Sequence, residues 1–283
     1  MPDSSARAAR DARDGTTPVR IAAMSDVHVS KTSHGTLAPI LAQVAERADV
    51  LLLCGDLTDY GTAEEARVLV KELGTLRLPT IAVLGNHDYE SGTPEVVADA
   101  LRDAGVTVLD GDSHEVHGIG FAGVKGFCGG FGRATLGSWG ERMVKAFVQE
   151  ALDETLKLET ALARLRTPQK VAVMHYSPVR DTVEGEPLEI FPFLGCGRHE
   201  EPLVRYQVAA AFHGHAHNGT PEGRLSHGAP VYNVALPLLK KRAPGELPVK
   251  FIELDPAGPA ADGAAYGGME RRRAVAAGAN GVA

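Results

Sequence analysis

The sequence predicts an α/β protein in which two β-sheets pack against each other with helices on the outside. Three observations support this: nearly continuous apolar runs early in the chain, helical patterns between them, and shorter strands later. The apolar runs are typical of parallel strands covered on both faces, and they lie at residues 19–24, 50–54 and 80–84. The helical patterns have the length of crossover helices and lie at residues 36–48, 62–74 and 94–104. We therefore expect the fold to start with a βαβαβ unit.

After a fourth short strand at residues 106–109, the pattern changes to strands separated by turns. Residues 114–117 and 119–124 flank Gly118 and predict an antiparallel hairpin. Residues 139–166 predict one long helix. The remaining strands are expected at residues 171–174, 208–212, 231–235 and 249–254. Because sheets must cover their apolar faces, we expect two sheets with helices on both sides.

The length and composition predict one domain with a sizeable core. The chain has 283 residues, of which 44% are hydrophobic and 23% charged, close to the averages of globular proteins. Residues 1–17 and 256–283 are rich in small and charged residues without apolar periodicity, so we expect disordered tails there. One folded domain is then expected over residues 18–255.

Charge, cysteine content and hydropathy argue against several classes of protein. The formal net charge is -7, from 29 Lys plus Arg against 36 Asp plus Glu, which gives no overall basic field for nucleic acid. Three widely spaced cysteines, Cys54, Cys128 and Cys196, suit a reducing compartment rather than a disulfide framework. No apolar run has the length of a signal peptide or a membrane span. We therefore expect a cytoplasmic protein that binds neither membranes nor nucleic acids.

Polar side chains follow each of the first three apolar runs, where the strands are expected to end. In chain order they are Asp26, His28, Asp56, Asp59, Asn86 and His87. Later strands are followed by His175 and by the pair His215 and His217. The carboxyl ends of parallel strands are where α/β proteins place their sites. Since residues two apart on an extended chain share a face, each D-x-H or H-x-H pair can bind one ion.

Seven of these residues carry the ligand types of a transition-metal site. They provide two carboxylates, four imidazoles and one amide oxygen, a set that suits manganese, iron or zinc rather than magnesium or calcium. Seven ligands are too many for one ion, and they are enough for two if Asp56 bridges both. The candidate metal ligands are Asp26, His28, Asp56, Asn86, His175, His215 and His217. Two divalent ions would keep this site cationic, so that it attracts phosphate and lowers the pKa of bound water.

Five short motifs carry these residues in a set order: D-x-H from residue 26, GDxxD from residue 55, GNHD from residue 85, the lone His175, and GHxH from residue 214. This order resembles that of the calcineurin-like metallophosphoesterases, over residues 19–255. The resemblance implies a β-sandwich flanked by helices in four α/β/β/α layers and a phosphoesterase with two metal ions. It implies that the first metal is bound by Asp26, His28, Asp56 and His217. It implies that the second is bound by Asp56, Asn86, His175 and His215, with Asp56 as the bridge.

The same resemblance implies catalytic roles for His87 and Asp59. His87 corresponds to a histidine outside the metal shell that steadies a phosphate oxygen and protonates the leaving group. Asp59 corresponds to the carboxylate that orients this histidine, and a carboxylate hydrogen bond also keeps an imidazole protonated beside two cations. We therefore expect His87 to act as the general acid.

Two long irregular stretches, residues 125–138 and 176–207, are candidate substrate loops. The second contains Arg180, Arg198 and His199, which could bind a phosphate oxygen or a second acidic group of the substrate. The alternative interpretation is that these three residues are solvated loop charges.

The motif set favours hydrolysis of a small phosphodiester or phosphomonoester, by in-line attack of a metal-bridging hydroxide with His87 as the acid. One alternative is a nuclease acting on DNA or RNA, because the double-strand-break repair phosphoesterases share GNHD and GHxH. A nuclease acting on long polymers is expected to have a basic groove or an added DNA-binding domain, and the sequence indicates neither. An alternative of another class is a scaffold that keeps this fold without catalysis. The complete motif set favours the enzyme, with a small phosphate ester as its partner.

Overall fold

The first of two sheets contains the strands that the early apolar runs predict. The structure, a computed structural model, describes residues 17–258. The first sheet has five strands in the order β11-β1-β2-β3-β4, in which β1 to β4 are parallel and β11 pairs antiparallel with β1. The strands are β1 (Val19–Met24), β2 (Val50–Cys54), β3 (Thr80–Val83), β4 (Thr107–Val108) and β11 (Lys250–Leu254).

The second sheet has six strands in the order β5-β6-β7-β8-β10-β9. Its four central strands are parallel, and β5 and β9 are antiparallel edges. The strands are β5 (Asp112–Val116), β6 (Ile119–Gly123), β7 (Gln169–Val173), β8 (Ala210–His213), β9 (Glu222–Arg224) and β10 (Pro230–Asn233). The predicted hairpin is confirmed between β5 and β6, where His117 and Gly118 both have positive φ angles, 52° and 76°.

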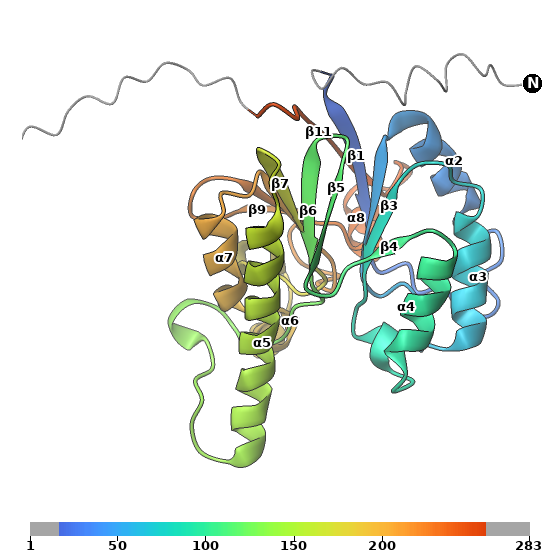
Figure 1. The fold of residues 1–283 in the computed structure, drawn as a ribbon. Coiled ribbons are helices and arrows are strands. Elements are labelled where there is room, and N and C mark those ends of the chain that lie inside the picture. Colours follow the sequence, from blue (N-terminus) through green and yellow to red (C-terminus); the bar gives the residue numbers. More distant parts are fainter. Residues whose placement is uncertain (1–16, 259–283) are drawn as a thin grey trace, which may run out of the picture.

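Helices cover the outer face of each sheet (Figure 1). The helices α2 (Ala38–Arg47), α3 (Ala63–Leu73) and α4 (Pro94–Asp103) pack on the first sheet. The long helix α5 (Arg142–Arg164) and the short α7 (Glu200–Arg205) pack on the second. The remaining short helices are α6 (Phe191–Leu194), α8 (Leu236–Arg242), η1 (His87–Tyr89), η2 (Gly132–Ala134), η3 (Arg180–Val183), η4 (Leu188–Ile190) and η5 (Gly197–His199). The predicted arrangement of two sheets between helices is therefore confirmed.

Side-chain alternation along β1 explains why the early strands are apolar at nearly every position; the exception in β1 is Arg20, which is half-buried and paired with Asp49. Ile21 and Ala23 face the second sheet and join the core between the two sheets. Ala22 and Met24 face the other way and join the core beneath α2, α3 and α4. Because both faces of the strand are buried, no position on it can be polar without cost.

The structure adds two elements that the sequence did not predict, β9 and α8, and divides the stretch 176–207 into short helices. The strand β9 has only three residues, Glu222 to Arg224, at the edge of the sheet, so it carries no apolar run. The helix α8 has seven residues, too few for a clear helical period. The predicted tails lie almost entirely on residues 1–16 and 259–283, which are outside the described part of the chain.

Candidate metal centre

The seven predicted metal ligands come from strand ends of both sheets, and the structure brings these ends together. Asp26 and His28 follow β1, Asp56 follows β2, and Asn86 follows β3. From the second sheet, His175 follows β7, and the GHxH histidines follow β8. A main-chain bridge between Ser25 and Ala235 joins the two sheets at this edge.

The first group of side chains consists of Asp26, His28 and His217, whose ligand atoms lie within 4.8 Å of one another. His217 Nε2 is 2.8 Å from Asp26 Oδ1. The main-chain N–H of His215 donates to both Asp26 carboxylate oxygens, at 3.1 and 3.0 Å. Burial opposes ionisation of Asp26, but the hydrogen bond with His217 keeps its pKa below the usual value. The carboxylate is therefore ionised and held in one orientation.

The second group consists of Asp56, His175 and His215, again within 4.8 Å. His175 Nε2 is 3.3 Å from Asp56 Oδ1 and 3.0 Å from Asn86 Oδ1, while His175 Nδ1 donates to the Cys54 carbonyl at 3.0 Å. Such a carbonyl contact orients a histidine so that its other nitrogen faces a metal. Burial disfavours the charged form of His175, but attraction to Asp56 outweighs it and raises the pKa to about 9.

The two groups meet at His28 and Asp56. His28 Nε2 lies 3.8 Å from Asp56 Oδ2, so the Asp56 carboxylate faces both groups. Within residues 17–258, His28 Nε2 is one of two buried side-chain nitrogen or oxygen atoms without a hydrogen-bond partner. A buried imidazole nitrogen without a partner is costly, whereas a metal ion would satisfy it. The donor types and this atom fit the pair of metal ions that the motifs imply.

Backbone strain concentrates at the same residues. Asp26, His28, Asp56 and His215 have φ angles of 55°, 42°, 50° and 69°, in the left-handed region that side chains other than glycine rarely adopt. Only two other non-glycine residues of the described chain share this property. Strained residues cluster at functional sites, where the surrounding structure enforces them.

Glycines before two of the ligands leave no room for a side chain. A Cβ at Gly85 would overlap the main-chain N and Oδ1 of Asp56. A Cβ at Gly214 would overlap Ser25 Oγ and Asp26 Oδ2. The glycines of GNHD and GHxH therefore let one motif approach the carboxylate of another.

Asp88, to which the sequence analysis assigned no role, ties two of the motif loops together. Its carboxylate is fully buried and accepts hydrogen bonds from the main-chain N–H groups of Leu57, Thr58 and Gly85, at 3.2, 2.8 and 2.8 Å. It also accepts one from Thr58 Oγ1, at 2.6 Å. Asp88 thus fixes the position of the loop that carries Asp56 and Asp59 relative to the segment that carries Asn86 and His87.

His87 lies beside the first group, but its partner differs from the expected one. His87 Nδ1 is 2.8 Å from the main-chain carbonyl of Asp59, and its main-chain N–H donates to Asp56 Oδ1 at 2.9 Å. The Asp59 carboxylate instead lies 3.5 Å from His28 Nδ1. The hydrogen bond of His87 Nδ1 is thus made with the main chain of Asp59, and the expected role of its carboxylate stays a prediction. Ligand atoms of His28, Asp59 and His87 still lie within 4.8 Å of one another.

The three candidate substrate residues lie away from the metal ligands. Arg180 and Arg198 line a groove of about 650 Å³ together with Arg224, and no predicted metal ligand lines it. His199 is buried, with Nδ1 2.8 Å from Thr155 Oγ1 and Nε2 accepting from the Phe127 N–H at 3.1 Å. Burial lowers the pKa of His199 to about 4. The structure thus brings His199 to neither the groove nor the metal ligands.

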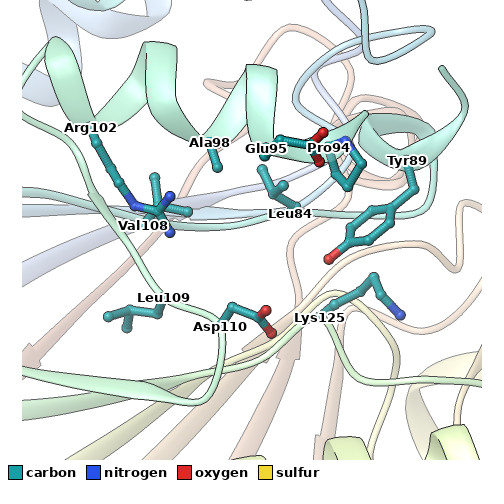
Figure 2. A pocket seen from close by; sticks show the side chains of 10 residues that line it. All are labelled: Leu84, Tyr89, Pro94, Glu95, Ala98, Arg102, Val108, Leu109, Asp110 and Lys125. Atoms are coloured by element: carbon teal, nitrogen blue, oxygen red, sulfur yellow. The ribbon is translucent and has the colours of Figure 1, made fainter. Parts of the chain in front are cut away.

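A second cavity, of about 250 Å³, lies next to Tyr89, whose hydroxyl points into it (Figure 2). No predicted metal ligand lines this cavity. Lys125 forms part of its wall, and its ammonium lies 4.9 Å from the Phe127 ring centre and 5.4 Å from those of Tyr89 and Tyr176. These contacts stabilise a buried cation and give it a structural role.

Comparisons with known proteins identify the family of the chain and structures similar to it. A family model described as calcineurin-like phosphoesterase matches residues 19–219. The chain is similar in structure to phosphopantetheinyl hydrolase of Mycobacterium tuberculosis, with 17% identity and a TM-score of 0.60, over 84% of this chain and 96% of that chain. It is also similar to GAP50, the anchor in the inner membrane complex of Plasmodium, with 12% identity and a TM-score of 0.47, over 78% of this chain and 72% of that chain. No curated protein sequence matches the chain.

The fold and the family match define a metal-dependent phosphoesterase. The chain belongs to the calcineurin-like phosphoesterase family, whose members use divalent metals to hydrolyse phosphate esters. Within residues 17–258, no helix has the length and apolar character that crossing a bilayer requires.

Replacing Asp88 by Asn should destabilise the protein, because the amide NH₂ would face main-chain donors that now bind a carboxylate oxygen. We expect the free energy of unfolding of the metal-free protein to fall by about 1–3 kcal/mol in urea titrations. Asp99→Asn is the matched control, since Asp99 is 68% exposed and forms an ion pair with Arg102 on the same helix. Equal unfolding midpoints for the two variants would contradict the role given to Asp88.

Proposed function

We propose that the protein hydrolyses small phosphate esters, diesters or monoesters, with two metal ions held by the two side-chain groups. The observation that carries this proposal is that the two ligand groups adjoin: His28 Nε2 of the first group lies 3.8 Å from Asp56 Oδ2 of the second. A carboxylate in this position can serve both groups, and His28 Nε2 is buried without a partner. A single ion would leave ligands of one group unused.

In this proposal Asp26, His28, Asp56 and His217 bind the first ion, and Asp56, Asn86, His175 and His215 bind the second. The mixed oxygen and nitrogen ligands suit manganese, iron or zinc. Such ions polarise a phosphate and lower the pKa of bound water to near neutral, which supplies a nucleophile. The chain's own part is to orient the ligands: the Cys54 carbonyl positions His175, and the His215 N–H positions Asp26.

His87 is proposed as the general acid. Its Nδ1–H donates to the Asp59 carbonyl, so Nε2 is the nitrogen that can contact a phosphate oxygen or the leaving group. Proton donation from Nε2 requires the doubly protonated ring. The carbonyl of Asp59 orients that ring through Nδ1.

Three observations favour this function over the alternatives. The similar structure from Mycobacterium tuberculosis is a phosphopantetheinyl hydrolase, which supports hydrolytic use of the fold. The acidic chain, with a net charge of -7, disfavours DNA or RNA as the substrate. The complete ligand set argues against a scaffold without catalysis, since unused ligands and strained backbone would be costly to keep.

The enzyme should hydrolyse bis(4-nitrophenyl) phosphate or 4-nitrophenyl phosphate when it is loaded with manganese, iron, zinc or nickel. His28→Ala should lower kcat/KM by more than about 100-fold. Removing a residue that only orients a metal ligand can already weaken metal binding or activity by up to about 100-fold, and His28 is itself a proposed ligand. His34→Ala is the control, since His34 is exposed and lies in none of the ligand groups. Protein that binds metal but hydrolyses neither ester would contradict the proposal.

His87→Ala should retain the metal ions and lose activity. General acid catalysis contributes about 10²- to 10⁴-fold, so we expect kcat to fall by that factor for an alkyl ester. The loss should be smaller for a 4-nitrophenyl leaving group, which needs little protonation. The measurement is kcat for both esters together with metal content by mass spectrometry. Loss of metal in this variant would show that His87 is a ligand and not the acid.

A further inference from the structure

We infer that the metal centre is bordered by an apolar subsite that binds the organic group of the ester, so that the preferred substrate carries one phosphate and a large apolar group. The inference rests on the proposed function. Its residues are Phe193 and Ile190, on the segment 187–194 that we call the rim segment, and Tyr60, which directly follows Asp59.

The rim segment is fastened directly to the second group of ligands. The Phe193 carbonyl lies 3.1 Å from His215 Nε2 and accepts a hydrogen bond from Cys128 Sγ at 3.3 Å. The Pro192 carbonyl accepts from the Gly129 N–H at 2.7 Å. With Nε2 engaged by the carbonyl, His215 has Nδ1 left for a metal. The main chain of Phe193 is therefore adjacent to a predicted metal ligand.

The inward side chains of the rim segment already have their own core. Phe191 and Leu194 are buried with Val183 and with Ala216, the residue between His215 and His217. This small cluster fixes the segment against the GHxH loop. The outward side chains are therefore not needed for packing.

Those outward side chains are large, apolar and solvent-exposed. Leu188 is 67% exposed, Phe193 56% and Ile190 38%. Single exposed apolar residues are common, but a group of them on one segment beside a site is typical of a binding surface. A ligand that covered them would gain hydrophobic free energy without any change in the fold.

An exposed aromatic residue also follows the GDxxD motif directly. Tyr60 is 58% exposed and comes directly after Asp59, whose carbonyl contacts His87. The buried Glu65 carboxylate accepts the Tyr60 N–H at 3.0 Å and the Thr62 N–H at 3.1 Å, which fixes the main chain there. The main chain at Phe193 thus contacts His215 of the second group, and the main chain directly before Tyr60 contacts His87 beside the first group.

The charge of the rim segment selects against ligands with several phosphates. The rim segment contains Glu189 and no Lys or Arg, and Glu186 directly precedes it. Of the arginines that line the 650 Å³ groove, Arg180 lies 5.5 Å from the centre of the inward-facing Phe191 ring, where its charge is paired with Glu184. A second phosphate next to the rim segment would meet carboxylates, whereas an alkyl or aryl group would meet apolar side chains.

The test varies the retained ester group and keeps the leaving group constant. With the metal-loaded enzyme, kcat/KM should rise along the series of methyl, butyl and octyl 4-nitrophenyl phosphodiesters, by up to about fourfold per methylene. Phe193→Ala and Tyr60→Ala should each reduce the ratio of kcat/KM for the octyl diester to kcat/KM for the methyl diester, mainly by raising KM for the octyl diester. Trp139→Ala is the matched control, since Trp139 is 62% exposed and belongs to neither the rim segment nor a ligand group.

A binding measurement that needs no turnover completes the test. In calorimetry with the metal-loaded enzyme, octylphosphonate should bind more tightly than methylphosphonate, and Phe193→Ala should reduce this difference while Trp139→Ala preserves it. Turnover with no dependence on chain length would overturn the apolar subsite and leave the proposed function standing. A chain-length dependence that both Phe193→Ala and Tyr60→Ala preserve would overturn these residues as its location. No turnover of any ester would contradict the proposed function itself.

Discussion

The centre depends on one buried carboxylate that is not among its predicted ligands. Asp88 accepts four hydrogen bonds, from Leu57, Thr58 and Gly85, and so joins the loop after β2 to the loop after β3. Asp56 and Asn86 stand on those two loops. Asp56 and Asn86 themselves lie outside any helix or strand, so these hydrogen bonds supply rigidity that regular structure would otherwise give. The geometry of the ligand groups follows from this contact.

Strained backbone at the ligands and close approach between neighbouring motifs also shape the two ligand groups. Four ligands adopt left-handed backbone conformations, which turn the chain sharply as it leaves each strand. Gly85 and Gly214 allow neighbouring motifs to approach without a Cβ between them. Each feature costs free energy in the metal-free chain, and metal binding would offset it. This explains how short motifs from two sheets can reach one small volume.

The sequence predicted most of the architecture because its signals are local. Continuous apolar runs mark β1, β2 and β3, whose two faces are both buried, and a Gly118 turn marks the hairpin. The ligand candidates were identified as strand-end residues, which the structure gathers into groups. Contacts between distant segments could not be predicted: the Asp88 hydrogen bonds, the Asp59 carbonyl rather than its carboxylate on His87, and the burial of His199 against Phe127 and Thr155. Such contacts depend on how loops meet in space, and periodicity carries no signal for that.

The central claim is that the two ligand groups hold two ions that share Asp56. The most direct measurement is anomalous diffraction from crystals of the enzyme grown with manganese. We expect two anomalous peaks, one beside Asp26, His28 and His217 and one beside Asn86, His175 and His215, with the Asp56 carboxylate between them. A single peak at full occupancy under saturating metal, or two peaks without contact to Asp56, would contradict the account.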